Sequence, residues 1–113
     1  MNAIRPSPRI VETANWIFRD GGKILSVRSH GRDRFYLPGG KIDADETAIE
    51  ALIREIREEL GVMLIEKSIR PLGIHAGRGH NQPSGVIVRM QCFAARFTGK
   101  LTPSREIAEM RWL

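Results

Sequence analysis

The stretch GGKIDADETAIEALIREIREELGV, residues 39–62, contains the densest run of acidic side chains in the chain. Seven of the 13 Asp and Glu residues fall between positions 43 and 59, although the formal net charge of the chain is +5. Like charges repel one another, so this crowding needs a reason. The run is either a solvated helix surface or the binding site of a strongly positive partner.

The pattern of residues 47–60 predicts an amphipathic helix. Thr47 followed by Glu50 forms a capping box, in which each side chain accepts a hydrogen bond from a free backbone N–H group. Gly61 follows the last helical residue, where glycine readily adopts the left-handed conformation that ends a helix. One apolar stripe along this helix is expected to face a sheet, and it consists of Ile49, Leu52, Ile53, Ile56 and Leu60.

Three glutamates, Glu55, Glu58 and Glu59, share another face of the same helix because they lie at positions i, i+3 and i+4. Arg54 can pair with Glu58 at i+4, which stabilises a helix by about 0.2–0.5 kcal/mol. The like-charged neighbours cost a similar amount, so ion pairing does not explain the face. A hard divalent cation such as Mg²⁺ prefers carboxylate oxygens. From this face alone, a metal site and a solvated surface remain equal alternatives.

The rest of the chain indicates a single domain, residues 1–113, of the α+β class. Strands are expected at 10–18 and 23–29, joined in a hairpin by RDGG at 19–22, because an Asp-Gly pair favours a tight turn. A short apolar segment covers 35–40. Further strands are expected at 70–77, 85–97 and 110–113, separated by loops at 78–84 and 98–106 that contain glycine or proline. The order of strands, one helix and more strands predicts a mixed layer structure.

Composition favours a cytoplasmic protein that is not in a membrane. The longest apolar runs are far too short to span a bilayer, and the first ten residues lack the apolar core of a secretion signal. Cys92 is the single cysteine, so no internal disulfide can form. The pI near 10.1 suggests attraction to anions, such as a nucleotide or a nucleic acid.

Residues 40–62 resemble the Nudix box of the Nudix hydrolase family without a departure. Gly40 is followed after five residues by Glu46, and after seven more by the run REIREELGV from Arg54. The chance of such a match at one starting position is on the order of 10⁻⁸ for average composition. The resemblance implies a Nudix-type α/β/α sandwich with a mixed β-sheet. The C-terminal helix that usually follows the last strand of this fold is absent from the given chain.

The resemblance also implies roles for residues of the box. Glu58 and Glu59 match the main metal ligands, and Glu55 matches a residue that ligates metal or activates water. Arg54 matches the arginine that orients these carboxylates, with Glu46 as its structural partner. Gly40 matches a loop glycine whose carbonyl oxygen can reach a metal. The implied cofactor is Mg²⁺ or Mn²⁺.

Residues outside the box are further candidates. Glu106 is the first candidate for an additional metal ligand or base, because the family has a late acidic loop before a strand with tryptophan, and Glu109 is the second. It is an equally good interpretation that Glu106 and Glu109 are ordinary acidic loop residues without a role in the site. A set of cations could bind the remaining phosphate charge, and its main members are Arg28, Arg34 and Lys41.

The expected activity is metal-dependent cleavage of a phosphoanhydride bond in a nucleoside diphosphate derivative, by attack of water at phosphorus. The expected partner is a small nucleotide such as a nucleoside triphosphate. RNA with a 5′ phosphoanhydride ranks below it, and the chain is expected to be a monomer or a homodimer. The alternative is a nucleotide-binding or regulatory module of the same fold without turnover, although such modules usually lose box carboxylates.

Overall fold

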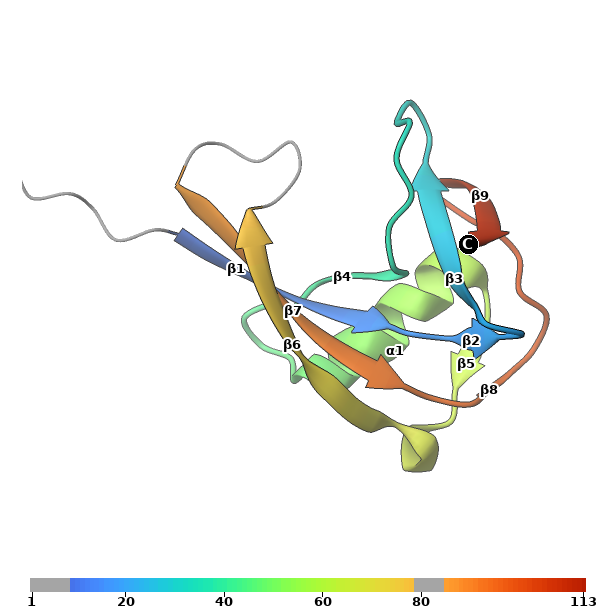
Figure 1. Cartoon of the computed structure of the whole chain (residues 1–113). Helices are drawn as coiled ribbons and strands as arrows, with labels where there is room; N and C mark the ends of the chain where they lie inside the picture. The colour runs from blue at the N-terminus through green and yellow to red at the C-terminus, as the bar shows by residue number, and fades with distance from the viewer. Residues whose placement is uncertain (1–8, 79–84) are drawn as a thin grey trace, which may run out of the picture.

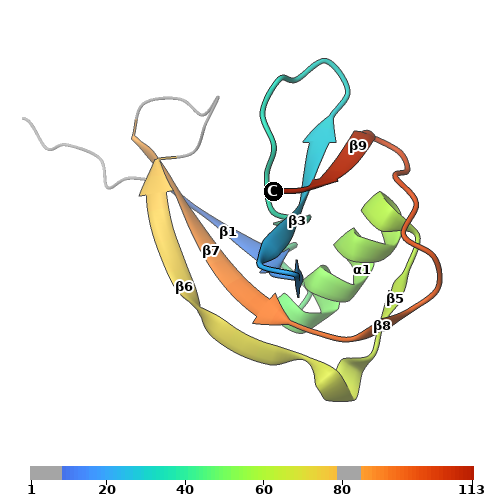
Figure 2. The same cartoon turned by 45° about the vertical axis from the view of Figure 1, so that its right-hand side comes forward.

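The computed structural model describes residues 9–78 and 85–113, and it contains two main sheets and one α-helix within that part of the chain. Figures 1 and 2 show a curved sheet with the helix α1 against its concave side. The elements in chain order are β1 (Arg9–Trp16), β2 (Arg19–Asp20), β3 (Lys23–Ser29), β4 (Gly39–Lys41), α1 (Ala48–Leu60), β5 (Met63–Leu64), the 3₁₀ turn Glu66–Ser68, β6 (Arg70–Arg78), β7 (Val86–Ala94), β8 (Phe97–Thr98) and β9 (Ile107–Trp112).

The larger sheet has four strands in the order β4-β1-β7-β6 and is mixed. The central pair, β1 and β7, is parallel over eight residues, from Arg9 opposite Val86 to Trp16 opposite Phe93. The outer strands β4 and β6 each run antiparallel to their neighbour. This mixed sheet with a helix confirms the predicted α+β class.

The second sheet has the order β2-β3-β9 and is antiparallel. The predicted hairpin at RDGG is correct in position but wrong in its strands, because β3 pairs with the two-residue β2 and not with the long strand β1. β1 instead enters the larger sheet. Phe18 and its neighbours carry the chain from one sheet to the other, which local alternation of residues cannot reveal.

The helix follows the prediction closely. Both hydrogen bonds of the capping box are present, from the Glu50 amide to Thr47 Oγ1 and from the Thr47 amide to Glu50 Oε1. Gly61 ends the helix with a φ of 69°, a conformation that costs other residues energy. The predicted short segment at 35–40 is shifted, since the strand β4 begins at Gly39.

The core lies between α1 and the two sheets. The apolar stripe of the helix packs there through Leu52, Ile56 and Leu60, all fully buried. Trp16 is fully buried as well, stacked on Phe18 with ring centroids 4.9 Å apart. Cys92 is buried, as expected for a core residue. The outer strand β6 is exposed along its whole length.

Two further expectations concern chain segments. The strands predicted at 85–97 and 110–113 appear as β7 with β8 and as β9, which begins three residues earlier than expected. The expected loop at 78–84 lies, apart from Arg78, outside the described residues.

Within the described ranges, no helix has the length and apolar character needed to cross a membrane.

Candidate metal and catalytic site

Three carboxylates from two distant parts of the chain meet beside α1. Glu55 and Glu59 come from the helix, and Glu106 comes from the loop before β9; one oxygen from each lies within 4.8 Å of the others. The turn before β9 is fixed by hydrogen bonds from the Ser104 amide to the Glu59 carbonyl oxygen and from the Ile107 amide to the Ser104 carbonyl oxygen. The last turn of the helix thus positions the loop that carries Glu106. We call Glu55, Glu59 and Glu106 the carboxylate cluster.

Glu59 is the buried member of the cluster, with 6% of its surface exposed. Burial raises its pKa to about 8, and the nearby carboxylates of Glu55 and Glu106 act in the same direction. The amide N–H of Gly39, 2.9 Å away, donates a hydrogen bond to Glu59 Oε1 and opposes the increase. A buried carboxylate with one amide donor leaves oxygen lone pairs free for a further positive partner.

Glu55 is also largely enclosed. Burial raises its pKa, while the guanidinium of Arg54, whose Nη1 lies 2.9 Å from Glu55 Oε1, acts to lower it. An ideal Cβ placed on Gly40 would lie 2.6 Å from the carboxyl carbon of Glu55. A hydrogen at this position is therefore needed for β4 to lie against the glutamate. Gly40 therefore lies next to the cluster, and the expectation that its carbonyl oxygen reaches a metal stays a prediction.

Arg54 holds the carboxylates of the box in fixed positions. Its guanidinium bonds to both oxygens of Glu46 and to Glu55, and its Nη2 donates to the backbone carbonyl of Lys41 at 3.2 Å. The hydrogen bond to Glu46 is the main reason that the pKa of Arg54 is raised and that of Glu46 lowered. Arg54 thus contacts both Glu46 and Glu55, and its role in orienting the carboxylates stays a prediction.

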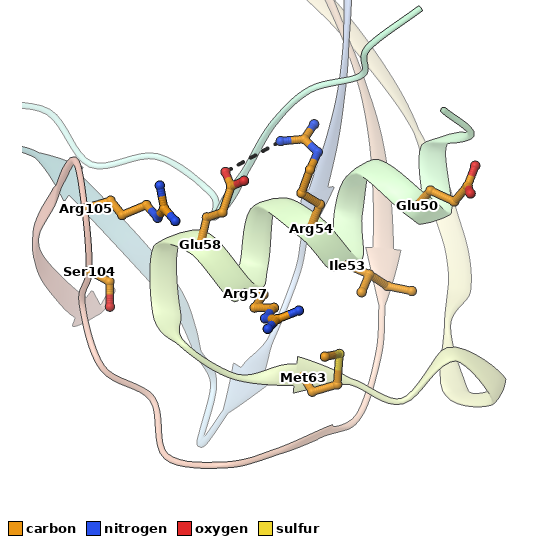
Figure 3. A pocket seen from close by; sticks show the side chains of 8 residues that line it. All are labelled: Glu50, Ile53, Arg54, Arg57, Glu58, Met63, Ser104 and Arg105. Carbon is orange, nitrogen blue, oxygen red and sulfur yellow. Dashed lines mark ion pairs between the residues drawn. The ribbon is translucent and has the colours of Figure 1, made fainter. Parts of the chain in front are cut away.

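Glu58 lies on the same side of the helix but is not in the carboxylate cluster. Its Oε2 is 3.6 Å from Arg54 Nη1, the ion pair marked by the dashed line in Figure 3. About a third of its side chain, 35%, is exposed. The predicted ligand set is therefore divided: Glu55 and Glu59 lie together with Glu106, and Glu58 faces solvent beside them.

The two late acidic candidates differ in their surroundings. Glu106 is exposed and joins the carboxylate cluster. Glu109 instead accepts a hydrogen bond from Arg28 Nε at 2.8 Å, and this bond lowers its pKa. The same Arg28 also donates to the carbonyl oxygens of Ser29 and Arg32. Arg28 thus links β3 to β9, and fewer of its N–H groups remain for a phosphate.

The other two predicted substrate contacts are exposed. Lys41 follows the glycine pair at the end of β4, and Arg34 lies in the loop between β3 and β4. Within the described part of the chain, the Arg34 side chain has no ion pair or hydrogen bond. Both remain predictions as substrate contacts.

A cavity of about 270 Å³ lies between the two sheets and ends at Glu59 and Gly40. Polar groups in its wall include Asn15, whose amide donates to the Leu37 carbonyl oxygen at 3.2 Å, and Tyr36. Reasoning from the sequence did not connect Asn15 with the site. Its place beside the box follows from the pairing of β1 with β4, for which the sequence holds no local signal.

The carboxylate cluster suits a divalent cation. It brings together oxygen atoms of three carboxyl groups, the type of ligand that Mg²⁺ and Mn²⁺ prefer. A cation there would favour the ionised form of all three groups and remove the repulsion among them. Glu55, Glu59 and Glu106 would hold it, and Glu58 lies outside this set.

The chain matches one family model and several known proteins. A profile of the NUDIX domain matches residues 8–113. The RNA pyrophosphohydrolase of Stutzerimonas stutzeri is 31% identical over 130 residues, covering 99% of this chain and 77% of that protein. The isopentenyl-diphosphate Delta-isomerase of Salmonella paratyphi B is 32% identical over 86% of this chain and 58% of its own length.

Solved structures agree in fold. The E. coli ORF135 protein superposes with a TM-score of 0.73 at 28% identity, covering 93% of this chain and 74% of that one. The MutT NUDIX hydrolase from Burkholderia pseudomallei gives a TM-score of 0.77 at 23% identity, over 92% and 82% of the two chains. At that identity the second likeness concerns the fold alone.

The fraction of each relative's length that aligns with this chain differs from one relative to the next. The chain spans 31% of the RNA pyrophosphohydrolase of Halorhodospira halophila, with 38% identity over 61 residues, and 60% of that of Xanthomonas campestris, with 32% identity. The profile match nevertheless covers nearly the whole chain and includes the box, the carboxylate cluster and both sheets. The chain belongs to the NUDIX family.

Proposed function

We propose that the protein is a metal-dependent pyrophosphohydrolase that cleaves a phosphoanhydride bond of a nucleoside diphosphate derivative by attack of water at phosphorus. The family match and the relatives named RNA pyrophosphohydrolase support hydrolysis of this bond type. The observation that carries the proposal is the meeting of Glu55, Glu59 and Glu106 within 4.8 Å next to an intact box.

The residues of the proposed site have different roles in hydrolysis. Glu55, Glu59 and Glu106 would hold Mg²⁺ or Mn²⁺, and Arg54 with Glu46 fixes the direction of Glu55. A bound divalent cation lowers the pKa of water and neutralises charge that develops on the phosphoryl oxygens. The alternative role for Glu55 is that of base: where Glu59 and Glu106 alone hold the cation, Glu55, whose pKa burial raises, would accept a proton from the attacking water.

The cavity between the sheets favours a nucleotide as the group that carries the phosphates. It leads to Glu59 and Gly40, and its wall combines apolar side chains with the polar groups of Asn15 and Tyr36, a mixture that is typical of small-molecule sites. The phosphate chain would lie over the carboxylate cluster. Lys41 and Arg34, which are both exposed, would then bind its outer oxygens.

RNA with a 5′ triphosphate is the second candidate substrate. Its support is the name shared by several relatives that are 31–38% identical to the chain. The reacting group would be the same as in a nucleoside triphosphate, so the carboxylate cluster does not distinguish the two. We infer that small nucleotides come first, because the cavity of about 270 Å³ is small for more than one nucleotide.

The test is turnover with a panel of nucleoside triphosphates, nucleotide sugars, dinucleotides and 5′-triphosphorylated RNA. Each is incubated with Mg²⁺, with Mn²⁺ or with EDTA, and products are separated by anion-exchange chromatography. We expect cleavage of a phosphoanhydride bond that requires metal. Bound nucleotide without cleavage of any member would contradict the proposal and favour a binding module of the same fold.

A further inference from the structure

A second and larger cavity, of about 610 Å³, lies on the outer side of α1, away from the space between the sheets. Figure 3 shows its walls, formed by the exposed side of the helix, by β5 and by the loop before β9. We call it the outer pocket. Its volume is in the range of sites for nucleotide-sized molecules. The side chains around it are Glu50, Ile53, Arg54, Arg57, Glu58, Met63, Ser104 and Arg105.

Two arginines give the outer pocket its free positive charge. Arg57 and Arg105 are both exposed, and neither side chain has an ion pair or hydrogen bond to any described residue. The charged groups beside them are engaged elsewhere. Glu50 caps the helix through the Thr47 amide, and Glu58 forms an ion pair with Arg54. Figure 3 shows Arg105 on the side of Glu58 and Arg57 on the side of Ile53, so each guanidinium is available to a different part of a bound ligand.

An apolar patch lies beside Arg57. Ile53 is one helical turn before it, and Met63 belongs to β5, with 43% of its surface exposed. Figure 3 shows Ile53, Arg57 and Met63 on the same side of the helix. A thioether and a branched aliphatic chain provide a surface on which a planar ring can pack, and an arginine can stack on the ring face.

The other arginine connects the outer pocket to the carboxylate cluster. Arg105 directly precedes Glu106 and adopts a φ of 54°, the one positive φ recorded for a non-glycine residue in the described part of the chain. Such a conformation costs energy for a residue with a side chain and is often retained for a functional reason. Here Glu106 belongs to the carboxylate cluster while Arg105 lines the outer pocket. Phosphates over the cluster would thus lie close to the outer pocket.

We propose that the outer pocket binds a nucleotide unit, with its phosphate at Arg105 and its base on Ile53, Met63 and the guanidinium of Arg57. The unit is either a separate mononucleotide or a later nucleotide of an RNA whose 5′ end occupies the carboxylate cluster. The proposal rests on the proposed function for the position of the 5′ end. Its test, however, requires no turnover.

The test uses protein labelled with ¹³C at the isoleucine and methionine methyl groups, titrated and observed by NMR. One ligand is AMP and the other is a 5′-monophosphorylated trinucleotide RNA, neither of which contains a phosphoanhydride bond. We expect concentration-dependent shifts of the methyl signals of Ile53 and Met63. The methyl groups of Ile10 and Ile74, exposed on the larger sheet, serve as internal references.

Two variants test the arginines. Arg57→Gln and Arg105→Asn are each expected to raise the dissociation constant about tenfold, since the first removes the cation stacked on the base and the second a charged hydrogen-bond donor to the phosphate. Asparagine tolerates the backbone conformation at position 105. Arg9→Gln is the matched control, because Arg9 is exposed on β1 and its side chain has no partner among the described residues. We expect this control to bind as the wild type does.

The outcomes separate the two sources of the nucleotide. Shifts with AMP indicate an independent mononucleotide site, and shifts with the trinucleotide alone indicate a subsite for an RNA chain. The proposal is overturned if neither ligand shifts Ile53 and Met63, or if both arginine variants bind like Arg9→Gln. Shifts in a protein that cleaves no member of the substrate panel would leave the outer pocket in place and refute the proposed hydrolysis.

Discussion

At the scale of single residues, the glycines of β4 show how the backbone approaches the carboxylate cluster. A Cβ at Gly40 would meet the end of the Glu55 side chain, whereas a Cβ at Gly39 would lie 2.1 Å from the backbone oxygen of Ala14. A side-chain carboxylate can move aside, but the backbone of β1 cannot do so cheaply. The two neighbouring positions should therefore respond to alanine in different ways.

We expect Gly40→Ala to lower the hydrolysis rate about tenfold or more with a small effect on stability. The new methyl group displaces Glu55 from its position, and changes around metal ligands typically cost 10–100-fold. Gly39→Ala should instead destabilise the fold by more than about 2 kcal/mol, because of the backbone contact and a φ of 137°. Steady-state rates and urea unfolding of both variants check this. Equal losses of stability would refute the distinction.

Glu59 predicts a dependence of stability on pH in the metal-free protein. Its pKa rises from 4.5 in the unfolded chain to about 8 in the fold, so the folded state binds the proton more tightly. The free energy of unfolding should then fall as pH increases from about 4.5 to 8 and level off above that range. The contribution of Glu59 is on the order of 3–5 kcal/mol.

Urea unfolding in EDTA at pH 5 and pH 8.5 measures this dependence. Glu59→Gln should remove most of it, because glutamine does not titrate and its amide oxygen can still accept the hydrogen bond from Gly39. Glu66→Gln, at an exposed position in the 3₁₀ turn, is the control and should keep the wild-type dependence. An unchanged pH dependence in Glu59→Gln would show that Glu59 is ionised throughout.

At the scale of elements, α1 carries most of the site and its ends are well defined. The capping box at Thr47 and the left-handed Gly61 fix where the helix begins and ends. The first of these ends lies far from the carboxylate cluster, because Glu55 and Glu59 are in the second half of the helix. A change at Thr47 should therefore lower the stability of the fold without lowering the hydrolysis rate.

We expect Thr47→Ala to destabilise the protein by about 1 kcal/mol, the usual cost of losing an N-cap side chain. The melting temperature should fall by about 4 °C. The hydrolysis rate below the transition should stay within about twofold of the wild type, since the carboxylate cluster is unchanged. Thr47→Ser, which keeps the hydroxyl group, is the matched control. A large loss of rate in Thr47→Ala at full folding would contradict this view of the helix.

At the scale of the whole molecule, a group of aromatic rings joins the two sheets. Trp16 at the end of β1 stacks on Phe18, and Phe18 contacts Trp112 of β9 with centroids 5.0 Å apart. Trp16 Nε1 also donates to the Ala95 carbonyl oxygen at 3.2 Å. The cavity that leads to Glu59 lies between these same sheets, so their relative position matters for binding.

We expect Trp16→Phe to lower the free energy of unfolding by about 2 kcal/mol, through a cavity and a lost hydrogen bond. Substrate affinity should weaken more than the maximal rate, because the carboxylate cluster is held by α1 and its adjoining loop. Urea unfolding and the separate measurement of kcat and KM check this. A loss confined to kcat would show that the sheets do not set the binding cavity.

The sequence predicts the helix and its box well because their signals are local. Capping residues, the apolar stripe and the glutamate spacing all lie within residues 47–61, and a helix places them without long-range information. The pairing of β1 with β7 and of β3 with β9 joins residues 77–87 positions apart. Alternating side chains do not encode such partners, which is why the predicted hairpin was assigned the wrong strand.

The candidate site likewise contains residues that local spacing brings together and residues that only the fold brings together. Glu55 and Glu59 follow from helical spacing, and Glu106 was proposed from the resemblance, but only the fold brings Glu106 to Glu59. Arg28 was predicted to bind phosphate, and the fold pairs it with Glu109, across the β3–β9 contact. The outer pocket was not foreseen, since Arg57 and Arg105 lie on separate elements with no shared pattern in the sequence.

The dependence of the hydrolysis rate on Mg²⁺ concentration decides whether the carboxylate cluster works through a metal. It is measured with the best substrate of the panel for wild type, Glu55→Gln and the control Glu66→Gln. We predict that wild type and control require Mg²⁺, and that Glu55→Gln loses at least about 100-fold in rate, because several kcal/mol of charge stabilisation depend on the metal. A rate that persists in EDTA, or an unaffected Glu55→Gln, would contradict a metal-dependent site on α1.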